Sequence, residues 1–391
     1  MSDGRSFPTV PALLSTNDDT AAGLVQGWGE GSPRRIGDYT IVGVLGSGGM
    51  GVVYRAEQHE PLRRDVALKV IRRGLDTDRL IARFEAERLA LARMNHSGIA
   101  RVLAAGATDD GRPYFAMELV TGAPITEFCD RQRLPVPDRL RLFVAACRAV
   151  QHAHQKGIVH RDLKPSNILV TTEEGSAAPK VIDFGIAKAL EGDAAEGELL
   201  LTREGQYVGT PEYMSPEQAG VVEADVDTRA DVYALGIVLY ELLAGRKPRR
   251  FTTGTRDDVQ HVLRNTSPER PSTAVGRRPR RRAVATPAPT TDDWQVIADA
   301  RQTTPARLRR QLAGDLDTIA LKAMAFEPSR RYPTVDRLVD DVERHLSGQP
   351  VLARPDEWTY RATKFAARHR WGVAGSGAAI VALVVFAVVT A

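Results

Sequence analysis

Residues 46–51 read Gly-Ser-Gly-Gly-Met-Gly, a run whose backbone amides can approach phosphate groups closely. Any Cβ atom there would hold the amides away from the phosphates, which is the expected reason for glycine. In dinucleotide-binding folds the same GxGxxG spacing leads from a strand into a helix. Here the next residues are Val-Val-Tyr-Arg (52–55), which predict a second strand and place the glycines at the tip of a β-hairpin. No βαβ unit follows, which argues against a dinucleotide-dependent enzyme.

A lysine that ends an apolar run follows this hairpin. After a glycine loop, Lys69 can reach the α- and β-phosphates of a nucleotide, provided that an acidic residue fixes its direction. The helix predicted at residues 78–94 carries apolar residues at steps of three and four, and Glu87 lies within that stripe. Because a carboxylate is costly to bury without a partner charge, Glu87 is the expected partner of Lys69. Glu85 faces elsewhere on the helix and is the second choice.

The most specific signal is His-Arg-Asp-Leu-Lys-Pro-Ser-Asn at residues 160–167. It is followed, 21 residues after Asp162, by Asp-Phe-Gly at residues 183–185. Both motifs lie downstream of the glycine loop and the lysine, and a chance match of this kind is negligible. On these residues the sequence closely resembles the eukaryotic-like (Hanks-type) bacterial serine/threonine protein kinases, over about residues 39–346. Lys164 and the Gly-Thr-Pro-Glu-Tyr run at 209–213 match the serine/threonine branch rather than the tyrosine branch.

The resemblance implies a role for each matching residue. Asp162 would accept the proton of the substrate hydroxyl, and Lys164 would neutralise the transferring phosphoryl group of ATP. Asn167 and Asp183 would hold two Mg²⁺ ions, with Mn²⁺ as a substitute. The expected catalytic residues are thus Asp162, Lys164, Lys69 and Glu87. The expected ATP-binding residues are Leu45, Gly46, Ser47, Gly48, Gly49, Met50, Gly51, Val53, Ala67, Lys69, the hinge residues Glu118 and Val120, and Leu169.

The pattern of the chain and the resemblance agree on an α+β, two-lobed protein kinase fold. Short runs rich in Val, Ile and Tyr predict a small β-rich N-lobe at about 39–119, and helical patterns predict a larger α-helical C-lobe at about 120–346. Two structural contacts are also implied: Glu217 pairs with Arg331, and Asp231 ties down the catalytic loop. Ser215 stands where the family usually has alanine, a departure expected to have no consequence.

The activation loop, at about 186–215, is the expected place of regulation. In this family an arginine directly before the catalytic aspartate, here Arg161, binds a phosphate on that loop. Thr202 lies eight residues before Thr210, where related bacterial kinases place their phosphorylated threonine. We therefore expect autophosphorylation of Thr202, with a transient homodimer for transfer between two copies.

Segments outside the predicted lobes have distinct compositions. Residues 1–38 are expected to be a flexible leader, and 266–306, rich in Pro, Thr and Arg, an insert in the C-lobe. The insert is interpreted as a solvated loop or as a docking site for acidic proteins or lipid headgroups. Residues 347–370 form a basic juxtamembrane segment before an uncharged stretch at 371–391, which is long enough for a transmembrane helix. Positive charge before the span predicts a single-pass protein of the cell (inner) membrane with a cytoplasmic kinase domain.

Charge and composition leave few other functions open. The net charge of +4 is small for 391 residues, so no nucleic-acid partner is expected. The two cysteines have no metal-type spacing. Three readings remain besides a kinase with protein substrates: a pseudokinase, a nucleotide-binding scaffold, and a kinase whose main role is membrane-linked assembly through the arginine-rich insert. The first two are disfavoured because Lys69, Asp162, Asn167 and Asp183 are all present.

Overall fold

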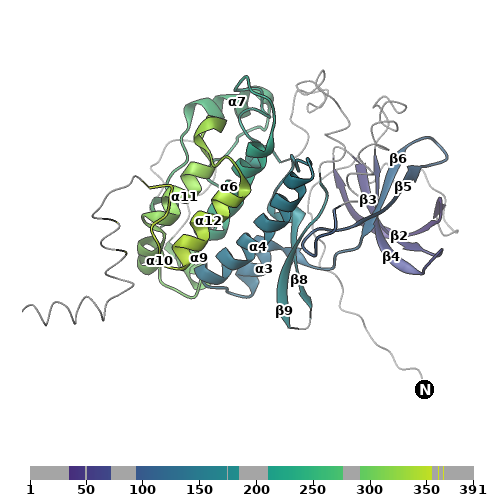
Figure 1. Cartoon of the computed structure of the whole chain (residues 1–391), viewed down its shortest axis with the longest axis horizontal. Coiled ribbons are helices and arrows are strands. Elements are labelled where there is room, and N and C mark those ends of the chain that lie inside the picture. Colours follow the sequence, from purple (N-terminus) through teal and green to yellow (C-terminus); the bar gives the residue numbers. More distant parts are fainter. Residues whose placement is uncertain are drawn as a thin grey trace, which may run out of the picture. The chain divides into compact units, whose positions relative to one another are not determined.

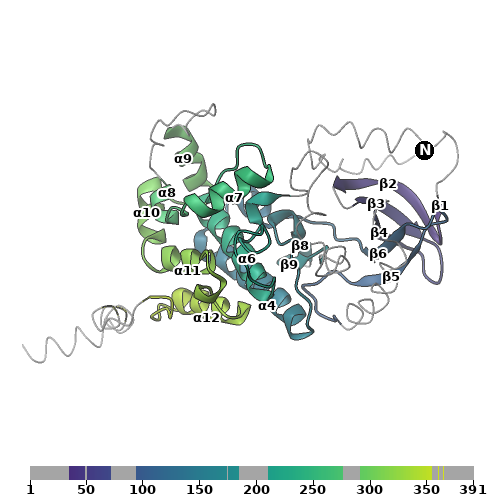
Figure 2. The ribbon, with the colours of Figure 1, turned by 90° about the horizontal axis from the view of Figure 1, so that it is seen from above.

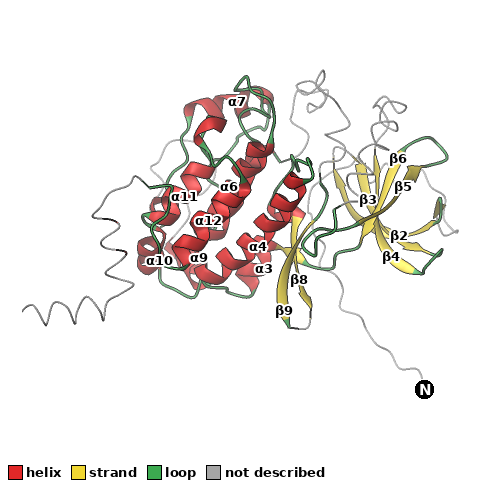
Figure 3. Cartoon of the chain, viewed as in Figure 1, coloured by secondary structure: helices red, strands yellow, loops and turns green. Residues whose placement is uncertain are grey.

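The chain divides into two compact units, each with its own core. The computed structural model describes residues 35–48, 51–71, 94–173, 175–184, 210–275 and 291–354, together with Tyr360 and Lys364. Within these residues the first unit is built of strands, and most of the second is helical (Figure 3). A small unit of strands followed by a larger helical unit is the two-lobed arrangement that the sequence predicts.

The first unit is a six-stranded antiparallel sheet (Figure 1), and its strands lie in the order β1-β2-β3-β4-β6-β5 (Figure 2). Its inner face is apolar because alternate side chains of β3 and β4, such as Ala56, Val66 and Leu68, are fully buried. The strands are β1 (Arg35–Ile36), β2 (Tyr39–Gly48), β3 (Gly51–Gln58), β4 (Arg64–Ile71), β5 (Val102–Ala107) and β6 (Pro113–Glu118).

The second unit packs its helices around α6, whose residues are nearly all buried (Figure 2). Asp227 caps the start of α6 by accepting a hydrogen bond from the Arg229 N–H, and Gly245 ends the helix in a left-handed conformation with φ of 68°. The helices are α3 (Ile125–Arg131), α4 (Val136–Gln155), α6 (Thr228–Ala244), α7 (Arg256–Asn265), α8 (Pro271–Ala274), α9 (Thr291–Asp299), α10 (Pro305–Leu312), α11 (Asp315–Ala323) and α12 (Val335–Leu346). Three short 3₁₀ turns, η1 (Pro165–Asn167), η2 (Pro211–Tyr213) and η3 (Pro328–Arg330), and a small sheet of β7 (Ala123–Pro124), β8 (Ile168–Glu173) and β9 (Ser176–Val181) complete the described part of this unit.

The insert expected at 266–306 is not a solvated loop over its whole length. Both of its ends are helical, α8 and α9, and both contribute to the core. Ala274, Trp294 and Ala298 are buried, and Arg301 donates hydrogen bonds to the Leu242 and Leu243 carbonyls at the end of α6. The apolar side chains flanking the Pro- and Arg-rich stretch therefore stabilise the helical unit. The arginines at 277–282 lie outside the described residues.

The chain continues to pack on the helical unit after α12. The fully buried Asp341 carboxylate accepts hydrogen bonds from the backbone N–H groups of Leu352 (2.5 Å) and Ala353 (2.8 Å). A second buried carboxylate, Asp315 at the start of α11, contacts three side chains of the same segment: Arg354 (3.3 Å), Tyr360 (3.0 Å) and Lys364 (2.7 Å). Residues 347–370 were expected only as a basic segment before a span. Their described part is docked on α11 and α12.

Asp315 should make the stability of the protein depend on acid pH. Burial alone would raise the pKa of this carboxyl, but hydrogen bonds from His345, Lys364 and Tyr360 outweigh burial and hold the pKa below its usual value. A depressed pKa in the folded state stabilises the protein above the unfolded pKa of about 3.9, and the stabilisation is lost as the pH falls further. In urea unfolding at pH 7, Asp315→Asn should cost about 1–3 kcal/mol, and the difference from wild type should shrink below pH ~4.

The control for this measurement is Asp109→Asn, since Asp109 lies in an exposed turn. It should leave the unfolding curve unchanged at both pH values. An Asp315→Asn protein as stable as wild type at pH 7 would mean that the contacts of Asp315 with the docked segment contribute nothing to folding.

Several expectations lie outside the described residues. They concern residues 1–34 of the leader expected at 1–38, the helix that carries Glu87, the activation loop with Thr202, and the apolar stretch at 371–391. The last four residues of the expected leader are instead part of the sheet unit, because Arg35–Ile36 form β1 and pair with β2. Among the residues that are described, no helix combines the length and apolar character needed to cross a membrane.

Candidate active site

The glycine loop is the tip of the hairpin between β2 and β3, as predicted. The two strands are antiparallel and Gly48 pairs with Gly51 across the turn, while Gly49 and Met50 lie outside the described residues. The space around the two glycines differs. A Cβ on Gly51 would collide with the Val70 carbonyl, whereas a Cβ on Gly48 would meet no atom of the described residues within 4 Å. Strand packing therefore requires glycine at 51 but does not explain the glycine at 48.

The other expected nucleotide-binding residues of the first unit lie on the same sheet. Val53 on β3 pairs directly with Lys69 on β4, and Ala67 on β4 pairs with Met117 on β6. At the end of β6, the Glu118 N–H donates to the Arg101 carbonyl at 2.9 Å, and the Glu118 carboxylate accepts the Arg101 N–H at 3.2 Å. Leu45 lies on β2 and is 43% exposed. Val120 follows β6, and Leu169 belongs to β8 of the second unit.

Three side chains of the catalytic motif meet within the second unit. The Asp162 carboxylate accepts hydrogen bonds from Lys164 Nζ at 2.9 Å and from Asn167 Nδ2 at 3.2 Å. Asn167 Nδ2 also donates to the Asp162 carbonyl at 2.8 Å, which fixes the amide. The Asp162 side chain remains 28% exposed. A carboxylate held by two donors and still reachable from solvent is suited to accept a proton from a bound hydroxyl.

A buried aspartate of α6 fixes the backbone just before Asp162. Asp231 accepts hydrogen bonds from the N–H groups of His160 (2.7 Å) and Arg161 (2.9 Å) and from His154 Nε2 (2.7 Å). Burial would raise the pKa of the Asp231 carboxyl, but the hydrogen bond and charge of His154 outweigh it and lower the pKa. The expectation that Asp231 ties down the catalytic loop is confirmed.

His160 links the catalytic loop to the Asp-Phe-Gly motif. It is fully buried, which lowers its pKa and favours the neutral ring. Its Nδ1 accepts the Asp162 N–H at 3.3 Å, so the proton is on Nε2, which donates to the Ile182 carbonyl at 3.1 Å. The ring also packs against Phe184, with centroids 4.6 Å apart. One side chain thus connects the Asp162 N–H to the residues on either side of Asp183, Ile182 and Phe184.

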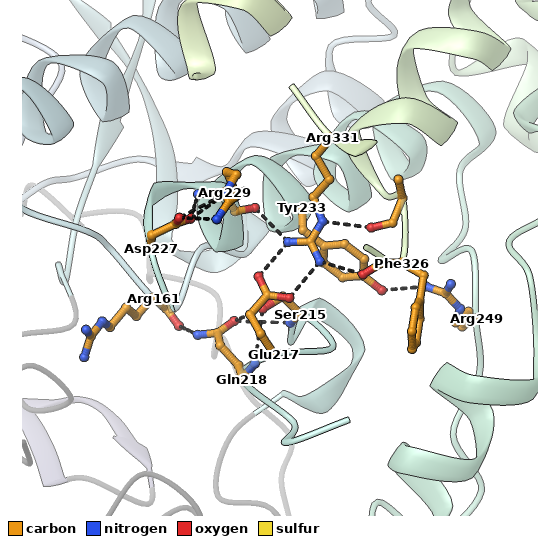
Figure 4. A network of polar contacts seen from close by, with 11 residues as sticks. Arg161, Ser215, Glu217, Gln218, Asp227, Arg229, Tyr233, Arg249, Phe326 and Arg331 are labelled. Atoms are coloured by element: carbon orange, nitrogen blue, oxygen red, sulfur yellow. Dashed lines mark hydrogen bonds and ion pairs between the residues drawn. The ribbon is translucent and has the colours of Figure 1, made fainter. Parts of the chain in front are cut away.

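The expected pair of Glu217 and Arg331 is also confirmed (Figure 4). The two side chains form a bidentate ion pair, Nη1 to Oε1 at 2.6 Å and Nη2 to Oε2 at 2.7 Å, and both are almost completely buried. Arg331 also donates to the carbonyls of Arg229 and Phe326 and lies over the Tyr233 ring. This pair connects the segment after the activation loop to the chain between α11 and α12.

Comparisons with known proteins decide what this arrangement is. The family model of the protein kinase domain matches residues 39–290, well over half of the chain. The chain belongs to the protein kinase family. It is 33% identical over 328 residues to the serine/threonine-protein kinase PknB of Mycobacterium tuberculosis, covering 82% of this chain and 45% of PknB. It is 38% identical over 244 residues to the serine/threonine-protein kinase pkn3 of Myxococcus xanthus, covering 62% of this chain and 43% of pkn3.

The fold comparison agrees with the sequence comparison. The crystal structure of the PknI kinase domain of Mycobacterium tuberculosis has a TM-score of 0.52 and 26% identity, covering 81% of this chain and 99% of that domain. The chain therefore has the two-lobed protein kinase fold, and the curated relatives that it resembles are bacterial serine/threonine-protein kinases. The chain spans less than half the length of the curated relatives it matches.

A protein kinase uses ATP with a divalent metal ion, and the donor set of this kinase fits one. Asn167 uses its amide NH₂ on Asp162, which leaves the amide oxygen as an acceptor, and the Asp183 carboxylate supplies hard oxygens. The Ile182 N–H donates to the Asn167 carbonyl at 2.9 Å, so the backbone just before Asp183 is hydrogen-bonded to Asn167. Among the described residues no three His, Cys, Asp or Glu side chains form a metal cluster. Two protein ligands suit Mg²⁺, which takes its remaining ligands from phosphates and water.

Sequence reasoning missed one residue beside the catalytic loop of the kinase. Gln218, next to Glu217, donates from Nε2 to the Arg161 carbonyl at 2.8 Å. Only its place next to the Ser-Pro-Glu motif could have drawn attention to it. Of the expected site residues, Gly49, Met50, Glu87 and Thr202 lie outside the described residues, as does Gly185 of the Asp-Phe-Gly motif.

Proposed function

We propose that this kinase transfers the γ-phosphate of ATP to serine and threonine hydroxyls of protein substrates. The observation that carries the proposal is the Asp162 carboxylate, which Lys164 and Asn167 hold while it stays partly exposed. The substrate hydroxyl gives its proton to Asp162, its oxygen bonds to the γ-phosphorus, and the bond from that phosphorus to the leaving oxygen of ADP breaks. Lys164 stabilises the negative charge on the group in transfer.

The family resemblance supports a role in nucleotide binding for several residues in each unit, taken separately. Asn167 and Asp183 would bind Mg²⁺, which neutralises charge on the phosphates when bound. Lys69, directed by Glu87, would contact the α- and β-phosphates. The glycine loop would cover the phosphates, and the backbone of Glu118 and Val120 would hydrogen-bond the adenine. Leu45, Val53, Ala67 and Leu169 would contact its ring.

The test is transfer of label from ATP by the full chain, purified in detergent, with Mg²⁺ and with EDTA. Label on serine or threonine that disappears with EDTA supports the proposal. Binding of ATP without any transfer, under conditions that activate a related kinase, would instead favour a pseudokinase or nucleotide-binding scaffold.

The kinase is also proposed to be anchored in the cell membrane by residues 371–391, with the catalytic units in the cytoplasm. Support comes from the uncharged length of that stretch and from Arg361, Lys364, Arg368 and Arg370 before it. The full chain should therefore sediment with membranes and resist extraction by carbonate, whereas a chain ending at residue 365 should be extracted.

Autophosphorylation of Thr202 is proposed to activate the kinase, with a transient homodimer for transfer between copies. A phosphate there would be recognised by Arg161, which directly precedes Asp162. Thr202→Ala should lower the rate of transfer to a peptide substrate at least about tenfold and remove one phosphopeptide from the digestion map. Thr255→Ala is the control, because Thr255 caps α7 and should change neither readout. An unchanged map and rate in Thr202→Ala would refute the proposal.

A further inference from the structure

Gln218 makes a hydrogen bond to the catalytic loop from a distant part of the sequence. Its Nε2 donates at 2.8 Å to the carbonyl of Arg161, the residue directly before Asp162 (Figure 4). The two residues are 57 positions apart, so this bond exists only in the folded second unit. It acts on the peptide group that joins Arg161 to Asp162.

That peptide group lies next to a backbone conformation that needs support. Arg161 has φ of 62°, in the left-handed region that non-glycine residues rarely adopt. Such conformations persist when the surroundings fix them from several directions. Asp231 holds the Arg161 N–H at 2.9 Å, and Gln218 holds the Arg161 carbonyl. The two bonds together fix the backbone on either side of Arg161.

The orientation of the Gln218 amide is set by Ser215. Gln218 Oε1 accepts hydrogen bonds from the Ser215 N–H at 3.2 Å and from the Ser215 hydroxyl at 3.1 Å. Since both are donors, the amide must point its oxygen to Ser215 and its NH₂ to Arg161. Ser215 is fully buried, so its hydroxyl depends on this partner. The serine in place of the usual alanine was expected to have no consequence. In the structure it orients Gln218.

We propose that Gln218, oriented by Ser215, is a positioning residue for Asp162. It holds the Arg161–Asp162 peptide so that the carboxylate stays aimed at the substrate hydroxyl. The inference rests on the proposed kinase function for its kinetic consequence, but its structural consequence for the catalytic loop can be measured without any transfer. The arrangement connects the Ser-Pro-Glu segment after the activation loop to the catalytic aspartate.

The chain offers a matched control for the test. Gln260 on α7 also donates from Nε2 to a backbone carbonyl at 2.8 Å, that of Ala219, and is partly buried like Gln218. Gln218→Met and Gln260→Met each remove one such bond. Gln218→Met should lower kcat about tenfold without changing KM for ATP, and should speed hydrogen exchange in the peptide covering residues 158–168. Gln260→Met should change neither.

A second variant keeps the shape of the side chain. Gln218→Glu places a carboxylate oxygen against the Arg161 carbonyl, so two acceptors face each other until the carboxylate is protonated. Its kcat should lie below wild type at pH 8, and the ratio to wild type should rise as the pH falls to 5.5. Equal kcat and equal exchange in Gln218→Met and Gln260→Met, or a Gln218→Glu protein as active as wild type at pH 8, would overturn the inference. A wild type without transfer, but with exchange that separates the two methionine variants, would refute the kinase proposal and leave the positioning role standing.

Discussion

Replacing Asp162 by asparagine should lower kcat for peptide phosphorylation about a thousandfold, with KM for ATP within a factor of about three. The asparagine side chain fits the same space between Lys164 and Asn167, but its amide cannot accept the proton of the substrate hydroxyl. Steady-state kinetics with a saturating peptide and binding of a fluorescent nucleotide measure the two quantities separately.

The control for this variant is the thermal unfolding curve, because a misfolded protein would also lose activity. The substituted side chain is 28% exposed and keeps its shape, so the midpoint should stay within a few degrees of wild type. A kcat within tenfold of wild type in a folded Asp162→Asn protein would show that another group accepts the proton.

Replacing Arg331 by methionine should cost about 3–5 kcal/mol of folding free energy, the largest stability effect we expect from one side chain. The change leaves the Glu217 carboxylate buried without the bidentate partner that it has at 2.6 and 2.7 Å. It also removes the donors to the carbonyls of Arg229 and Phe326. Urea unfolding followed by tryptophan fluorescence gives the difference.

The adjacent arginine provides the comparison. Arg330 pairs with Glu327 at 2.6 Å, but their side chains are 75% and 51% exposed. Exposed pairs contribute little, so Arg330→Met should cost less than about 1 kcal/mol. Similar losses in the two variants would mean that the burial of the Glu217–Arg331 pair is not what makes it important.

The sequence was sufficient for features that depend on local pattern or on a family motif. The hairpin of β2 and β3, the mostly helical second unit, and the contacts of Asp231 and Glu217 were all expected and are present. The hydrophobic pattern predicts the secondary structure, and the family motif predicts the residues that are in contact.

Features that depend on tertiary contacts between ordinary polar residues were missed. Gln218 contacts Arg161 only after α6 and the catalytic loop have packed. The residues next to Gln218 in the sequence do not predict a partner 57 residues away. Asp315 and Asp341 resemble surface acids of short helices until the chain after α12 returns to cover them. The apolar residues of α9 follow a Pro- and Arg-rich stretch. Because the insert at 266–306 was predicted from composition, its range wrongly included this helix.

The packing of residues 351–354, Tyr360 and Lys364 on α11 and α12 bears on how far the kinase can work from a bilayer. A free tether of residues 347–370 could extend at most about 80 Å. With Lys364 held at Asp315, only six residues separate the helical unit from the proposed span, a reach of at most about 20 Å. The catalytic loop would then act at a nearly constant height, and a substrate would be selected by how close to the bilayer it carries its serine or threonine.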